Sequence, residues 1–128
     1  MGGMPSTRKL LLVLFADDAC RQNHALMYAL DLHEKGYGVR LILEGAATKL
    51  VSAIGDGESR TGALLRQARD AGLVAGACGR ASSGCAGEDP ARKVADVAEA
   101  AGVRLLAELH GHASIEPFVR DGYEVVVM

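Results

Sequence analysis

The chain is poor in aromatic residues and carries little net charge. Aromatic side chains make up 4% of its 128 residues and tryptophan is absent. We therefore expect an aliphatic core without the stacking platforms that bind single-stranded nucleic acid. The formal net charge of −2 provides no basic field for DNA, RNA or an anionic membrane. No apolar run approaches the roughly 20 residues that span a bilayer, so neither nucleic acid nor a membrane is expected as a partner.

Cysteine is also scarce, and its copies fit no common pattern. Cys20, Cys78 and Cys85 form an odd set, and no spacing matches a paired Cys-x-x-Cys zinc motif. The short apolar run over 10–16 ends in two aspartates without a cleavage site, so it is interpreted as a strand rather than an export signal. An odd set of cysteines without a secretory signal indicates a reducing, cytoplasmic location and at least one free thiol.

Common cofactor-binding and hydrolase motifs are missing as well. The Gly-rich stretch 76–87 lacks the Gly-Lys-Ser/Thr of a Walker loop, and no Gly-x-Gly-x-x-Gly follows the first apolar run. The Gly-x-Ser-x-Gly elbow of an α/β-hydrolase does not occur. We therefore expect no cofactor, and we assign no residue as the ligand of a resident metal.

What the chain does contain is a regular alternation of apolar runs and helical patterns. Its length suits one domain, expected over 8–128 after a disordered leader at 1–7. The predicted strands cover 9–16, 38–43, 73–78, 103–109 and 123–128. The predicted helical segments cover 23–35, 46–54, 59–71, 89–101 and 114–120. Such alternation predicts an α/β fold with a mainly parallel five-stranded sheet and helices on both faces.

Capping residues and glycines separate these segments. Ser59 is expected to cap one helix, whose buried stripe is predicted as Leu64, Ala68 and Ala71. Asp89 and Pro90 are typical of the start of the next helix. Glycines at 36, 72, 102 and 122 are expected to end the helices that precede them, and the Gly/Ser-rich stretch 79–88 predicts a loop.

Residues that can do chemistry follow the ends of the predicted strands. The carboxyl ends of parallel strands form one edge, where ligands bind in open α/β sheets. The residues expected at this edge are, in chain order, Asp17, Asp18 and Cys20, then Glu44, then Cys78, Arg80 and Ser82, and finally Glu108, His110 and His112.

Cys78 is the candidate catalytic residue because a buried strand delivers its thiol to this edge. The thiolate is the reactive form of cysteine, and a neighbouring cation lowers the pKa of a thiol. Arg80 is positioned in the sequence to supply that charge, and Ser82 to donate a hydrogen bond. The alternative is an inert cysteine that packs like a small hydrophobic residue.

The remaining candidates support Cys78 or are incidental. Cys85 is either a resolving thiol or an exposed loop cysteine. Cys20 is a weaker candidate because its acidic neighbours raise the pKa of a thiol. His24, near the same edge, can act as an acid or an anion ligand. His110 and His112 offer a base or metal ligands, or are surface histidines.

The order of these segments resembles the DsrE-like family of small α/β proteins, which includes sulfur-relay subunits. The resemblance rests on the strand 10–15 and the helix that contains 25–30, the strand and turn over 36–45, the strand 73–78 and the ending 115–127. It implies a three-layer α/β/α sandwich and a homo-oligomer, often a trimer or hexamer. Family members commonly continue from the strand-end cysteine into a helix, whereas the stretch 79–88 predicts a loop here.

Two functions are therefore predicted. In the sulfur-relay members that the chain resembles, a strand-end cysteine carries a persulfide between a donor and an acceptor protein, and only Cys78 lies at that position. In a sulfur carrier or sulfurtransferase of this kind, Arg80 and the loop amides would stabilise the thiolate. The alternative is a non-catalytic module that binds a small ligand, an anion or a metal among His110, His112, Asp17 and Cys78.

Overall fold

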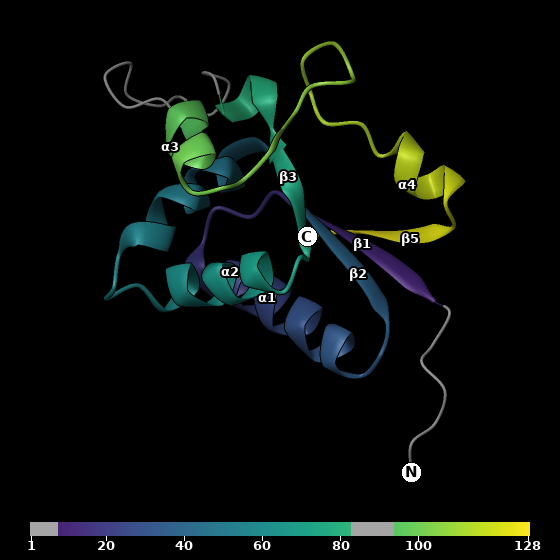
Figure 1. Cartoon of the computed structure of the whole chain (residues 1–128), viewed down its shortest axis with the longest axis horizontal. Helices are drawn as coiled ribbons and strands as arrows, with labels where there is room; N and C mark the ends of the chain where they lie inside the picture. Colours follow the sequence, from purple (N-terminus) through teal and green to yellow (C-terminus); the bar gives the residue numbers. More distant parts are fainter. Residues whose placement is uncertain (1–7, 83–93) are drawn as a thin grey trace.

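The computed structural model describes residues 8–82 and 94–128. Within these ranges five strands form one sheet in the order β4-β3-β2-β1-β5 (Figure 1). The strands are β1 (Lys9–Leu14), β2 (Gly38–Leu43), β3 (Val74–Cys78), β4 (Leu105–Leu106) and β5 (Tyr123–Val127). All neighbouring pairs run parallel. The predicted α/β class and the five-stranded parallel sheet are therefore confirmed.

The helices cover the two faces of the sheet unequally. They are α1 (Ala19–Glu34), the 3₁₀ helix η1 (Gly45–Gly55), α2 (Arg60–Asp70), α3 (Val94–Ala100) and α4 (Glu116–Arg120). Helices α1, α2 and α3 lie on one side of the sheet, and the short α4 lies on the other (Figure 1). No helix in the described ranges is long and apolar enough to cross a membrane.

The continuous apolar sequence of β1 follows from this two-sided covering. Leu12 and Leu14 pack with the buried residues of α1, α2, α3 and η1, whereas Leu11 and Val13 pack on the side of α4 with Phe118. All four leucine and valine side chains are buried. A strand of a parallel sheet that is covered on both faces has no position for a polar side chain.

Side-chain caps determine where the helices begin. The Asp18 carboxylate accepts a hydrogen bond of 2.9 Å from the backbone N–H of Arg21, so α1 begins at Ala19, earlier than the predicted start at residue 23. Ser59 caps α2 as predicted, because its Oγ accepts from the Gly62 N–H at 2.9 Å. Glycines at 36, 72, 102 and 122 have positive φ angles between 74° and 92° and end the helices before them.

The buried face of α2 differs from the prediction. Leu65 is fully buried together with Ala68, whereas Leu64 is only partly buried. The reason is the close approach of Gly62 to η1, where an added Cβ would lie 1.9 Å from the Ala53 carbonyl oxygen. This contact turns the face that contains Gly62 and Leu65 toward the core.

Two further predictions near the carboxyl edge need correction. The fourth strand covers only Leu105–Leu106 instead of 103–109, because the chain turns sharply after it. The predicted loop 79–88 begins as a helical turn over 79–82, directly after Cys78. The rest of that loop and the predicted helix start at Asp89 and Pro90 lie outside the described residues.

Gly76 allows β4 to lie close to β3, and this gives a test of the packing beside Cys78. A Cβ at Gly76 would lie 2.4 Å from the Arg104 carbonyl oxygen and 2.8 Å from Leu106 Cγ. We expect Gly76→Ala to lower the free energy of unfolding in urea by about 1–3 kcal/mol, the usual effect of overpacking. Gly55→Ala, where nothing lies within 4 Å of the added Cβ, is the control. Equal losses in the two variants would contradict the close approach.

Candidate functional site

Three side chains that can do chemistry meet at the carboxyl edge of the sheet. Glu44 follows β2 directly, Cys78 is the last residue of β3, and His112 lies in the segment after β4. The thiol sulfur of Cys78 lies 3.4 Å from Nδ1 of His112. One carboxylate oxygen of Glu44, the thiol sulfur and one imidazole nitrogen all lie within 4.8 Å of one another. We call this group the Glu44–Cys78–His112 cluster.

Glu44 is held in place at both its backbone and its side chain. Its N–H donates to the Leu14 carbonyl at 2.9 Å, which continues the pairing of β2 with β1. Its Oε1 accepts a hydrogen bond of 2.9 Å from the Gly45 N–H at the start of η1. Because both ends of the residue are fixed, the carboxylate stays next to the end of β3.

A tight turn places His112 beside Cys78. Leu109 and His112 exchange two backbone hydrogen bonds of 2.9 and 2.8 Å. The two central residues have positive φ angles, 49° at His110 and 90° at Gly111, as a type I′ turn requires. The Arg80 N–H donates to the Gly111 carbonyl at 2.8 Å and holds the turn against the chain that follows β3. The turn therefore directs one histidine to the thiol and leaves His110 exposed.

The surroundings of Cys78 favour its neutral thiol. Burial is the main cause that raises the pKa of Cys78, and the Glu44 carboxylate raises it further through a hydrogen bond and its charge. The backbone N–H groups of Ala81 and Ala113 act in the opposite direction and lower this pKa. The side chain of Cys78 is fully buried. At neutral pH the thiol is therefore protonated and covered.

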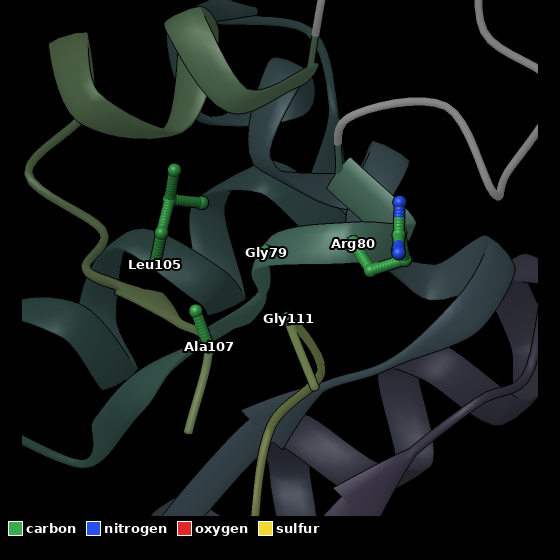
Figure 2. A pocket seen from close by; sticks show the side chains of 5 residues that line it. All are labelled: Gly79, Arg80, Leu105, Ala107 and Gly111. Carbon is green, nitrogen blue, oxygen red and sulfur yellow. The ribbon is translucent and has the colours of Figure 1, made fainter. Parts of the chain in front are cut away.

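Arg80 is not among the groups that shift the pKa of Cys78, and its role as an activating cation stays a prediction. The pKa of Cys78 is raised rather than lowered, and its causes lie in burial, Glu44 and backbone groups. Arg80 is exposed, and its side chain lines one side of a pocket of about 340 Å³, with Leu105 and Ala107 on the other side (Figure 2). Gly79 and Gly111 complete this pocket, so it lies beside the cluster although Cys78 does not line it.

Ser82, Cys20 and His24 form no hydrogen bond with the thiol in the described ranges, and one predicted residue lies outside them. Ser82 is fully buried, and its Oγ has no hydrogen-bond partner in the described part of the chain. Cys85 lies outside the described residues. Cys20 and His24 form an exposed pair on α1, with 3.8 Å between Sγ and Nδ1. His24 also lines a separate pocket with Val127 and Met128, at the β5 side of the edge.

Of the two partners of Cys78, the sequence predicted His112 as a base or a metal ligand, whereas it gave Glu44 no role beside the thiol. Both were expected at the carboxyl edge, so strand ends were the signal that pointed to them. The signal that distinguishes His112 from His110 is the glycine between them. Gly111 allows the I′ turn, which leaves its first histidine at the tip and returns the second toward the sheet.

Comparisons with known proteins find one relative of the chain to report, and this relative has no assigned activity. No protein-family model matches the chain, and no solved structure matches it. An uncharacterized protein from Archaeoglobus fulgidus is 46% identical over 41 residues, which cover 32% of this chain and 67% of the archaeal protein. The chain therefore belongs to the same family as this archaeal protein, whose description names no activity.

The raised pKa of Cys78 makes the stability of the protein depend on pH. Folding favours the neutral thiol, so this stabilisation is complete below the pKa of an unfolded thiol, about 8.5. It is lost as the pH rises from there toward the higher folded value. In urea titrations above about pH 8.5, wild type should lose stability more steeply than Cys78→Ala. Cys20→Ala, which removes an exposed thiol, should behave like wild type; parallel profiles of all three would contradict the shift.

Proposed function

We propose that the protein is a sulfur carrier in which Cys78 holds a persulfide between a donor and an acceptor protein. The observation that carries the proposal is the contact of 3.4 Å between the Cys78 sulfur and His112 Nδ1 at the carboxyl edge of the sheet. A nucleophile and a base within reach of each other are the arrangement that activates a weak nucleophile. The position of Cys78 at the end of a strand agrees with its resemblance to DsrE-like sulfur-relay subunits.

The transfer step needs no oxidant or reductant. His112 takes the thiol proton of Cys78 as the sulfur attacks the outer sulfur of the donor's persulfide. The new bond joins Cys78 to that outer sulfur, and the bond between the donor's two sulfur atoms breaks. The donor leaves as a thiolate and takes the proton from His112. In the second transfer the acceptor thiol gives its proton to His112 and attacks the outer sulfur of the Cys78 persulfide. The sulfur–sulfur bond of this persulfide breaks, and Cys78 leaves as a thiolate that takes the proton from His112.

Burial gives this carrier a protected resting state. A neutral thiol that is covered by protein reacts slowly with oxidants, because the thiolate is the nucleophile. The donor must therefore displace part of the cover before sulfur is transferred.

The proposal includes a homo-oligomer in a reducing, cytoplasmic environment, as the resemblance and the odd number of cysteines suggest. Size-exclusion chromatography with light scattering is expected to give a trimer or a hexamer. A monomer over a wide concentration range would remove the oligomer from the proposal and would leave the chemistry of Cys78 to be tested separately.

Sulfur loading tests the proposal directly. The reduced protein is incubated with a cysteine desulfurase, cysteine and a metal chelator, and its intact mass is followed. Wild type should gain one sulfur atom on Cys78, and Cys78→Ser should gain none. Cys20→Ser is the matched control, because it removes an exposed thiol that also has a histidine nearby. Cys85→Ser should still gain one sulfur atom on Cys78.

The histidine pair in the turn tests the role of the base. His112→Asn should slow loading by about 100-fold, within the usual range for loss of a general base. His110→Asn, in the same turn, should load at the wild-type rate. Loading of Cys78→Ser at the wild-type level would reject the carrier role of Cys78, and equal rates in the two histidine variants would reject His112 as the base.

A further inference from the structure

We propose that Glu44, Cys78 and His112 form a binding site for one divalent metal ion of the zinc type. The three residues come from separate parts of the chain, yet each presents an atom that binds metals, and these atoms lie within 4.8 Å of one another. This inference does not rest on sulfur transfer. It uses the same thiol in a second, mutually exclusive state.

The spacing of the ligand atoms fits a small tetrahedral ion. Zinc–sulfur and zinc–nitrogen bonds at a tetrahedral angle separate the two ligand atoms by about 3.6 Å. The observed separation between the Cys78 sulfur and His112 Nδ1 is 3.4 Å. These two ligands therefore need little movement, and Glu44 needs only a side-chain adjustment because its carboxylate already lies within 4.8 Å of both.

The surrounding backbone orients the ligands before any ion is bound. Oε1 of Glu44 accepts from the Gly45 N–H, and a carboxylate can keep such a bond through one oxygen while the other binds a metal. His112 is fixed by the two hydrogen bonds of its turn and by the bond from Arg80 to Gly111. Groups that hold a ligand in place in this way are the usual outer shell of a metal site.

The donor set indicates which ion is favoured and how it is coordinated. Sulfur, imidazole nitrogen and carboxylate oxygen together suit borderline ions such as Zn²⁺ and Co²⁺ better than Mg²⁺ or Ca²⁺, which take oxygen ligands. Three protein ligands leave a fourth tetrahedral position open, as in catalytic zinc sites. Binding releases the thiol proton of Cys78 to solvent, and the metal-bound sulfur is no longer free to accept sulfur from a donor.

Cobalt binding tests the site without any assay of activity. The full chain, reduced and freed of metal by a chelator, is titrated with Co²⁺, and charge transfer from thiolate to metal is measured by absorption. Wild type should bind one equivalent and show this band. Cys78→Ser should lose the band. His112→Asn and Glu44→Gln should each weaken Co²⁺ binding by at least about ten-fold, because even the loss of an outer-shell residue typically lowers metal affinity by this factor.

The controls lie in the same turn and in the other cysteine–histidine pair. His110→Asn and Cys20→Ser should bind Co²⁺ like wild type. Absence of a thiolate band in wild type, its loss in Cys20→Ser, or its survival at full strength in both His112→Asn and Glu44→Gln would overturn the proposal.

A second measurement needs no substitution and therefore does not depend on the folding of a variant. The folded protein is alkylated at neutral pH with and without Zn²⁺, and the alkylation of each cysteine is measured by peptide mass spectrometry. Zinc should suppress the alkylation of Cys78, because the metal-bound sulfur is not free to attack the reagent, and it should leave the alkylation of Cys20 unchanged. Equal protection of both cysteines, or of neither, would contradict the site. Loading with sulfur in a chelator tests the carrier separately, so failure of one proposal leaves the other intact.

Discussion

The site depends on the burial of one thiol between a carboxylate and an imidazole. A buried negative charge is costly unless it is paired, and the Glu44 carboxylate beside Cys78 adds to the cost of forming the thiolate. At neutral pH the thiol therefore loses its proton more readily when the proton moves to His112 or when a cation takes its place. Both proposed activities follow from this constraint, because one transfers the proton and the other supplies the cation.

The same constraint explains why the turn after β4 is as important as the strand that carries the cysteine. The end of β3 presents the thiol, and the pairing of β2 with β1 presents the carboxylate. Neither strand brings an imidazole. The histidine arrives from the I′ turn, whose position is secured by the hydrogen bond from Arg80 to Gly111. Arg80 thus contributes through its backbone N–H, whereas its guanidinium has no part in the causes of the thiol's pKa.

Much of the fold could be predicted from local sequence, whereas the role of Glu44 beside Cys78 and the choice between His110 and His112 could not. The bounds of β2 agree with the prediction because Gly38 and Leu43 stand between clear turn signals. The Ser59 cap also follows from a local hydrogen bond. The face of α2 was wrong because a distant contact between Gly62 and Ala53 decides it. The choice of His112 over His110 likewise depends on turn geometry and on a bond to another segment.

The edge strand β5 shows how the sheet ends on the side away from Cys78. Among the strands in residues 8–82 and 94–128 it pairs with β1 alone, and Val126 and Val127 at its end are exposed. Such a strand is a template on which a second chain can add its own strand. Glu124 interrupts the apolar sequence of β5, and the Arg8 guanidinium holds its carboxylate through two hydrogen bonds of 2.9 and 2.8 Å. Charged side chains on an edge strand disfavour pairing with another chain, whereas an exposed ion pair adds little to folding stability, so we expect this pair to act mainly against aggregation.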